Sequence, residues 1–212
     1  MDRNYEVCLE FVFDREAGLV CDPNDPGGAT NLGITIGVLG EWRNRKATTD
    51  DVRGLSRDEA AAIYRARYWH AARCEHLPDG IDLLVFDAAV NMGVQPALNL
   101  LRAQAGLGVA ARLRKSKHPV VRPGRMQVDA AEAYLLAAID GLCGPGVIAG
   151  LAGRRRAFYR SLKTFTRYGK GWLARVALAE RLAMRLWATG GTGIPLTQVR
   201  AVSRHRSRAA TH

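Results

Sequence analysis

Two adjoining stretches decide the fold of this chain: Tyr5-Glu-Val-Cys-Leu-Glu-Phe-Val-Phe13 and Cys21-Asp-Pro-Asn-Asp-Pro-Gly-Gly-Ala-Thr-Asn31. In the first, apolar residues recur at helical spacing and form one stripe, which predicts an amphipathic helix. Glu16 takes the next position of that stripe, and Gly18 supplies a helix stop. The second stretch is dense in turn-forming residues and predicts a loop directly after the helix.

Glu16 is the residue of this region that points to chemistry. A carboxylate on an apolar stripe is costly when it is buried in its charged form. Desolvation raises the pKa of such a group, and a carboxyl group that keeps its proton near neutral pH is what general-acid catalysis of glycoside cleavage requires. The alternative interpretation is that Glu16 emerges into solvent as the helix ends.

The loop after Glu16 offers candidates for a second catalytic group. Glycoside hydrolysis needs a group that positions water or stabilises positive charge at the sugar carbon. Asp25 lies nine positions after Glu16, and Thr30 lies fourteen positions after it. The alternative is a set of Asx turns in which the aspartates only cap backbone amides, and Asp22 fits this structural role better than Asp25.

The rest of the chain predicts a mainly α protein with minimal strand. Ser56-Arg-Asp-Glu59 is a capping box that opens a helix to about Trp69. Asp79 is a candidate cap for a helix that passes Asn91 and ends at Gly93. Leu32–Thr35 could form a short extended segment, and Gly106–Gly124 reads as a loop. Further helices are expected at Pro96–Ala105, Gln127–Leu142, Arg154–Phe165 and Trp172–Ala188.

Charge is distributed unevenly over the 212 residues, whose net charge is +11. Residues 1–87 hold 16 acidic and 10 basic residues, a balance of −6, whereas residues 88–212 hold 4 acidic and 21 basic residues, a balance of +17. A basic half of this kind concentrates polyanions such as nucleic acid, anionic cell-wall polymer or lipid head groups. The alternative is a solvated helix face.

Cysteine spacing and hydropathy exclude several classes of protein. The four cysteines (Cys8, Cys21, Cys74 and Cys143) are scattered without metal-ligand spacing, so we interpret them as reduced structural thiols. No metal site is expected. No apolar run approaches the ~20 residues of a spanning helix, and the N-terminus lacks the apolar core of a signal peptide.

Several motifs in fixed order resemble the glycoside hydrolase family 108 muramidases, the phage-type endolysins and "secretion activator" proteins that cut peptidoglycan. The resemblance covers roughly residues 5–105. The motifs are Glu16-Ala-Gly, Asp22-Pro-Asn-Asp-Pro-Gly-Gly-Ala-Thr-Asn31, Gly33-Ile-Thr35, Tyr64-Arg-Ala-Arg-Tyr-Trp69, Leu77-Pro-Asp-Gly80 and Phe86-Asp-Ala-Ala-Val-Asn-Met-Gly93. One departure is Ala17, which stands where the family has the first glycine of its Glu-Gly-Gly motif.

The resemblance implies a lysozyme-like fold and hydrolysis of the β-1,4 bond between N-acetylmuramic acid and N-acetylglucosamine, without a cofactor. It assigns the catalytic roles to Glu16 as acid, Asp25 and Thr30. Candidate substrate-binding residues are Asn31, Tyr68, Trp69 and Asn91. Tyr68 and Trp69 could instead pack in the core, and Asp87 and Asn91, four apart on one helical face, could instead form hydrogen bonds within the fold.

The chain is expected to divide into a lysozyme-like catalytic domain (1–105), a basic helical part (106–188) and a disordered basic tail (189–212). The basic part resembles, more weakly, the predicted peptidoglycan-binding domain of the family. This likeness rests on Arg156-Ala-Phe-Tyr-Arg160, Phe165 and Gly169-Lys-Gly-Trp-Leu-Ala-Arg-Val176. Within it, Arg112–Arg125 looks like an insertion. The expected partners are peptidoglycan glycan strands and an anionic cell-wall polymer.

Two other functions stay open from the sequence. One is a catalytically inactive peptidoglycan-binding or secretion-accessory protein, with Ala17 as the mark of lost activity. The other is a nucleic-acid-binding protein, although the positive charge follows no recognition motif and nucleic acid is not expected as a partner. The absence of a signal peptide predicts synthesis in the cytoplasm and action in the periplasm or cell wall after export through a holin-like pore or a dedicated route.

Overall fold

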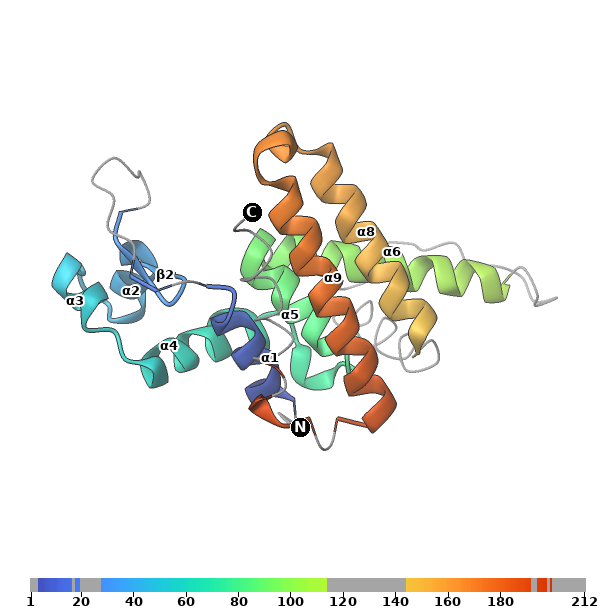
Figure 1. Cartoon of the computed structure of the whole chain (residues 1–212), viewed down its shortest axis with the longest axis horizontal. Coiled ribbons are helices and arrows are strands. Elements are labelled where there is room, and N and C mark those ends of the chain that lie inside the picture. Colours follow the sequence, from blue (N-terminus) through green and yellow to red (C-terminus); the bar gives the residue numbers. More distant parts are fainter. Residues whose placement is uncertain are drawn as a thin grey trace, which may run out of the picture.

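The computed structural model confirms a mainly α fold with a single small sheet (Figure 1). It describes residues 4–16, 18, 19, 28–113, 144–191, 194–197 and 199, of which 106–113 by their backbone alone. The elements are α1 (Tyr5–Phe13), β1 (Thr30–Asn31), β2 (Ile34–Thr35), α2 (Ile36–Trp42), α3 (Thr49–Arg53), α4 (Arg57–Tyr64), the π-helix η1 (Arg65–His70), the 3₁₀-helix η2 (Cys74–His76), α5 (Ile81–Met92), α6 (Val94–Leu113), α8 (Pro145–Ser161) and α9 (Phe165–Thr189).

Helix α5 forms the centre of the molecule. Its residues from Ile81 to Ala89 are all buried, and it contacts α1, α6, α8 and α9. In Figure 1 it lies between α1 on one side and the antiparallel pair α8–α9 on the other. A helix that is apolar on all faces is expected in such a position, because every face is covered by another element. The two carboxylates that interrupt this helix, Asp82 and Asp87, are therefore both buried.

Residues Thr30 to Thr35 form a short hairpin with a two-residue turn. Strands β1 and β2 pair antiparallel with Thr30 opposite Thr35, and the turn consists of Leu32 and Gly33, which both have positive φ angles of 50° and 75°. Two consecutive positive φ angles are what a tight hairpin turn with the twist of its strands requires. The extended segment expected at Leu32–Thr35 is thus the turn and second strand of this hairpin.

The predicted caps of two helices have different outcomes. The Ser56 hydroxyl accepts a hydrogen bond from the Glu59 backbone N–H at 3.1 Å and begins α4 as expected. The expected cap at Asp79 is wrong, because α5 begins after Gly80, which has a φ of 84°. The Asp79 carboxylate instead accepts a hydrogen bond from the Asn4 side chain at 2.7 Å.

Three helix boundaries also differ from the sequence expectation. Helix α6 continues to Leu113 although Gly106 predicts a loop, since single glycines cost only about 1 kcal/mol in a helix. Helix α8 begins at Pro145 and ends at Ser161, and α9 begins at Phe165 rather than Trp172. A Cβ atom at Gly169 would lie 2.5 Å from the Phe165 ring, so only glycine leaves room for that ring. The expected helix at 127–142 lies outside the described residues.

The α8–α9 pair shares its core with the N-terminal elements. Ile148, Leu151, Leu182 and Leu186 belong to the same buried cluster as the side chains of α1 and α5. Ile194 and Val199 were expected in a tail without packed structure, but they are also buried in that cluster. The domain boundaries at 105/106 and 188/189 stay predictions. None of the described helices is both long enough and apolar enough to cross a membrane.

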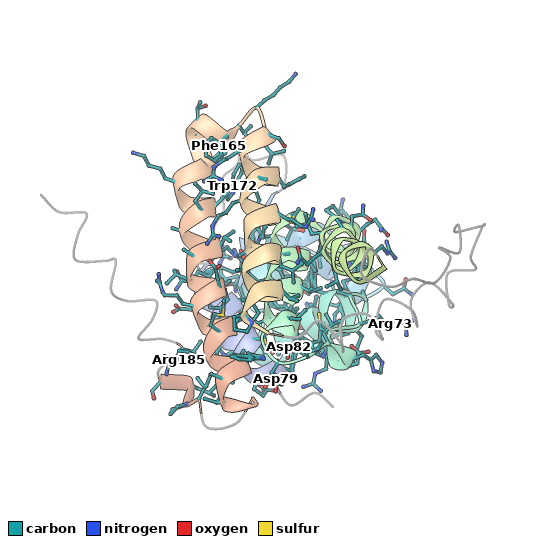
Figure 2. All side chains as sticks on the ribbon, turned by 90° about the vertical axis from the view of Figure 1, so that its right-hand side faces the viewer. Arg73, Asp79, Asp82, Phe165, Trp172 and Arg185 are labelled. Carbon is teal, nitrogen blue, oxygen red and sulfur yellow. The ribbon has the colours of Figure 1, made fainter. Side chains whose placement is uncertain are left out.

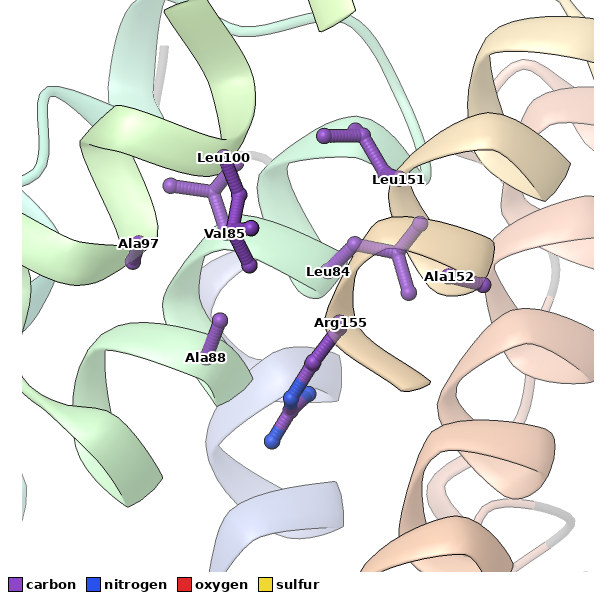
Figure 3. A pocket seen from close by; sticks show the side chains of 8 residues that line it. All are labelled: Leu84, Val85, Ala88, Ala97, Leu100, Leu151, Ala152 and Arg155. Carbon is purple, nitrogen blue, oxygen red and sulfur yellow. The ribbon is translucent and has the colours of Figure 1, made fainter. Parts of the chain in front are cut away.

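A small cavity of about 10 Å³ remains between α5, α6 and α8 (Figure 3). Its lining is apolar apart from Arg155, whose guanidinium points away from the leucines in Figure 3. A space of this volume holds about one water molecule. We therefore interpret it as a packing defect of the core and not as a ligand site.

Cys8 and Cys74 are buried free thiols, as expected from their spacing. Burial raises the pKa of both groups well above the ordinary value, and nearby Asp82 adds to the effect. Such thiols stay protonated and unreactive. Cys21 and Cys143 lie outside the described residues.

Asp82 is a buried carboxylate whose pKa links the stability of the fold to pH. Burial raises its pKa to about 7, although hydrogen bonds from Asn4, Leu83 and Gly80 act in the opposite direction. The Asn4 amide donates to the Asp82 carboxylate at 2.7 Å. Because the folded pKa lies above the ordinary value, the folded chain binds more protons between about pH 4 and pH 7. Asp82 therefore makes the fold less stable as pH rises through that window.

We expect Asp82→Asn to weaken this pH dependence. Between pH 5 and pH 8 the free energy of unfolding of the parent protein should fall by on the order of 2 kcal/mol because of this group. The Asp82→Asn variant should not show this part of the decrease. Thermal unfolding at several pH values measures the difference, with the exposed Asp58→Asn as a matched control. Parallel pH profiles of the parent and Asp82→Asn would contradict the assignment.

Candidate active site

Glu16 lies just beyond α1, where its carboxylate meets the last long helix of the chain. The Glu16 Oε1 accepts a hydrogen bond from Arg175 Nη1 at 2.7 Å. The side chain is 24% exposed, so the group is neither in bulk water nor fully desolvated. The structure thus places Glu16 in a half-buried ion pair, between the buried position and the solvent-exposed position that the sequence leaves open.

Arg175 joins Glu16 to the central helix. Its Nε donates to Asp87 Oδ1 at 2.7 Å, and its side chain is 11% exposed. Burial alone would lower the pKa of Arg175, but Asp87 and then Glu16 outweigh burial and raise it. The arginine therefore stays charged between its two carboxylates.

Asp87 is fully buried and accepts hydrogen bonds from two arginines. Arg155 Nη1 donates to the second carboxylate oxygen, and Arg155 Nη2 donates to the Asp87 carbonyl at 3.3 Å. Burial alone would raise the pKa of Asp87, but Arg175 and then Arg155 hold it below its ordinary value. A buried carboxylate with two guanidinium partners is a rigid point from which Arg175 is aimed at Glu16.

The network continues toward the surface through Tyr159. Arg155 Nε donates to the Tyr159 hydroxyl at 2.9 Å, and that hydroxyl donates to Asn91 Oδ1. The Tyr159 ring stacks on Trp172 with ring centres 5.0 Å apart. Figure 2 shows Trp172 and Phe165 toward one end of the α8–α9 pair, and Asp79 and Asp82 toward the other end. The hydrogen-bonded network therefore ends at Tyr159 and Asn91, beside the Trp172 ring.

The hairpin turn also lies against Glu16. The Tyr64 hydroxyl donates to the Leu32 carbonyl at 3.0 Å and ties the turn to α4. A Cβ at Gly33 would lie 2.3 Å from that hydroxyl and 2.9 Å from Glu16 Cγ, and the φ of Gly33 is 75°. Only glycine lets the turn approach Glu16 so closely. The stretch Gly33-Ile-Thr35 therefore has a direct role in placing the carboxylate.

An open pocket of about 330 Å³ adjoins the ion pair. It lies along α9 and reaches the end of α1 and of α5. Its lining residues are Arg15, Asn91, Gly171, Trp172, Ala174, Arg175 and Leu178. An aromatic side chain beside a few polar and charged groups is typical of a site that binds a small molecule.

Of the residues predicted to act next to Glu16, the structure describes Thr30 and Asn31, which form β1. Asp25 lies outside the described residues, so its position relative to Glu16 stays a prediction. Thr30 is half-buried in β1, opposite Thr35. The Asn31 side chain donates to the Val52 carbonyl at 3.0 Å and ties β1 to α3, so in this structure its amide supports the hairpin.

The three other residues predicted to contact substrate lie in different surroundings. Tyr68 is half-buried in η1 with its ring 5.5 Å from that of Tyr64; burial raises its pKa, and the Glu16 charge contributes. Trp69 is 1% exposed and packs edge-on against Tyr5 and Phe86, so it belongs to the core. Asn91 lines the pocket while it accepts a hydrogen bond from Tyr159.

Sequence reasoning did not single out Arg155 and Arg175, although both carried a signal. Arg155 follows Ile148 and Leu151 at helical spacing, and both of these residues are buried. Arg175 stands on the stripe that continues through Leu178, Leu182 and Leu186. A cation on an apolar stripe is as costly as the carboxylate that drew attention to Glu16.

The fold and the site define a mainly α, lysozyme-like protein in which a half-buried glutamate adjoins an open pocket. The chain belongs to glycosyl hydrolase family 108, whose model matches residues 9–93. It is similar to the solved structure of SagA from Brucella abortus, with 30% sequence identity and a TM-score of 0.69. That likeness covers 88% of this chain and 97% of SagA. No curated protein matches the sequence.

The family supports a lysozyme-like peptidoglycan hydrolase function for this chain. The part matched by the family model holds Glu16 and Asp87, whereas Arg155 and Arg175 follow it in the sequence. The likeness to SagA extends over a larger share of the chain. The two carboxylates of the network therefore lie within the residues that the family model matches, and the two arginines that bind them lie beyond those residues.

Proposed function

We propose that this protein is an N-acetylmuramidase that cleaves the β-1,4 bond between N-acetylmuramic acid and N-acetylglucosamine in peptidoglycan. The observation that carries the proposal is the Glu16 carboxylate, held by Arg175 beside an open pocket in a chain of family 108. Glu16 is the general acid that protonates the leaving glycosidic oxygen. Asp25 orients water or stabilises the oxocarbenium-like transition state, and Thr30 helps to hold that water.

The ion pair with Arg175 sets a condition for this chemistry. A general acid must carry a proton when the leaving oxygen departs, whereas the Glu16 carboxylate accepts a hydrogen bond from Arg175 in the free protein. Binding of the glycan therefore has to draw Arg175 away from Glu16, or share its hydrogen bonds, before Glu16 gains its proton. Asp87 gives Arg175 a second carboxylate partner that stays in place during such an exchange.

The site of action that fits this substrate is the periplasm or cell wall, for lysis or for remodelling during release or secretion. The α8–α9 pair adds a basic surface with exposed side chains that include Arg160, Lys163, Arg167 and Lys170. Such a surface attracts an anionic cell-wall polymer through long-range electrostatics.

Mass spectrometry of the muropeptides released from purified peptidoglycan tests the reaction. We expect soluble fragments that end in a reducing N-acetylmuramic acid. Fragments with a reducing N-acetylglucosamine would replace the muramidase by a glucosaminidase. No released fragments, with binding to peptidoglycan retained, would favour the inactive accessory protein, and salt-sensitive binding to DNA alone would favour the nucleic-acid-binding protein.

A further inference from the structure

The pocket beside Glu16 is lined by two arginines that each have an N–H group without a partner. Arg15 Nε and Arg175 Nη2 are buried and make no hydrogen bond to any residue that the structure describes. Both residues line the pocket of about 330 Å³. Most buried donors in proteins are paired, because an unpaired buried donor destabilises the fold. Two cations with unpaired donors line one pocket, and a rotation of each side chain toward the pocket would let a bound hydrogen-bond acceptor pair with them.

The charges of the two arginines favour an anionic ligand. Burial lowers the pKa of Arg15, and the positive charge of nearby Arg175 lowers it further, against the effect of Asp14. Arg15 Nη2 forms an ion pair with Asp14 Oδ2 at 3.1 Å. Arg175 gives its other donors to Glu16 and Asp87. When Glu16 takes up a proton, one positive charge at the pocket has no counter-charge.

The other lining residues limit the size and character of this ligand. Trp172 is half-buried at the pocket, and Gly171 and Ala174 leave room on α9 beside it. Asn91 adds an amide whose oxygen is already bonded to Tyr159. A ligand with an apolar sugar face and an attached acidic group therefore fits better than a bare inorganic ion.

We propose that this pocket is a carboxylate subsite, in which Arg15 and Arg175 bind an acidic group attached to the muramic acid residue of the substrate. The proposal rests on the proposed function. Two sources have the same chemistry: the lactyl carboxylate of a muramic acid without peptide, and a carboxylate of the attached peptide. Binding there gives Arg175 a new partner and frees Glu16 to take up the proton that it donates. The subsite thereby links recognition of muramic acid to the protonation of the acid.

Titration calorimetry on the full chain with four probes tests the subsite without requiring turnover. The probes are N-acetylglucosaminyl-N-acetylmuramic acid, its methyl ester, the disaccharide with an L-alanyl-D-isoglutamate peptide, and chitobiose. We expect the preferred acidic probe to bind about 10-fold or more tightly than the ester and chitobiose, as for hydrogen bonds to a charged group. Tight binding of the free disaccharide acid identifies the lactyl source, and tight binding of the peptide form alone identifies the peptide source.

Variants of Arg15 make the test specific. Arg15→Gln should reduce the preference for acid over ester to about 3-fold or less, since it removes one of two charged donors. Arg15→Lys, which keeps the charge, should retain part of the preference. Arg181→Gln, an exposed arginine of α9 that does not line the pocket, is the matched control and should keep all of it.

Two results would overturn the subsite. One is equal or undetectable binding of the acid and ester probes by the parent protein, which would mean that the unpaired donors bind only solvent. The other is the same preference in Arg15→Gln as in Arg181→Gln. Neither result depends on hydrolysis. A protein that cuts peptidoglycan without discriminating acid from ester would keep the proposed function and lose only this inference.

Discussion

Glu16→Gln should abolish the release of muropeptides while the fold stays intact. Glutamine has the shape of glutamate and its carbonyl can still accept the hydrogen bond from Arg175, but it has no acidic proton to give to the glycosidic oxygen. General-acid catalysis contributes about 10²–10⁴-fold to the rate, so kcat should fall by that factor with a smaller change in KM. The assay is the rate of reducing-end formation from purified peptidoglycan.

The best control for Glu16→Gln is another glutamate in a similar ion pair. Glu59 accepts a hydrogen bond from Arg43 at 2.7 Å, the same distance as in the pair of Glu16 with Arg175. Glu59→Gln should lose about 1 kcal/mol of stability at most and keep its activity. Circular dichroism and thermal unfolding should show both variants folded. Equal lysis by Glu16→Gln and the parent protein would refute the role of Glu16.

The first helix and the start of α4 could be read from the sequence because their signals are local. The apolar stripe of α1 and the cap at Ser56 each depend on residues within one or two turns of each other, whereas the extended segment expected at Leu32–Thr35 is the turn and second strand of a hairpin. The family resemblance then supplied the substrate class. Residue spacing alone gave Glu16 as a candidate acid and left its burial open.

The partners of Glu16 could not be read from the sequence. Arg175 is 159 positions away in the chain, and the contact depends on how α9 packs across α5. The rule that identified Glu16 would also have identified Arg155 and Arg175 as unusual, since both stand on apolar stripes. It would not have said which carboxylate each arginine binds. That choice is made by tertiary packing.

The boundaries of α8 and α9 were predicted wrongly for a different reason. Pro145 is a good first residue for a helix, yet the glycines at 146, 150 and 153 lower the helix propensity after it. In α9, Gly169 lies directly over the Phe165 ring, so its missing side chain is used for packing. Propensity treats these glycines as helix breakers, whereas the structure uses one of them for a close contact.

Asp87→Asn should cause the largest loss of stability of any single polar substitution in this network. The aspartate is fully buried between Arg155 and Arg175, and asparagine keeps its size but removes the negative charge. Two buried guanidinium groups would then lack their shared counter-charge. Breaking a buried ion pair from one side costs about 3–5 kcal/mol. Urea unfolding at pH 7 measures the loss.

Two comparisons separate this effect from a general loss of charge. Asp51→Asn, which disturbs the more exposed pairs with Arg43 and Arg45, should cost much less stability than Asp87→Asn, because solvent screens these pairs. Because the pKa of Asp87 is lowered in the folded state, its stabilisation is present above the ordinary pKa and is lost as pH falls through the folded value. The difference in the free energy of unfolding between the parent protein and Asp87→Asn should therefore become smaller in strong acid.

The same substitution connects stability to function, because Asp87 holds the arginine that holds Glu16. Below the unfolding temperature, Asp87→Asn should lower kcat in the fraction that stays folded, since Arg175 loses its fixed partner at Nε. Asp51→Asn should leave kcat unchanged under the same conditions. An Asp87→Asn protein that is as stable as Asp51→Asn would mean that Arg155 and Arg175 do not depend on this carboxylate, and full kcat in its folded fraction would remove Asp87 from the positioning of Glu16.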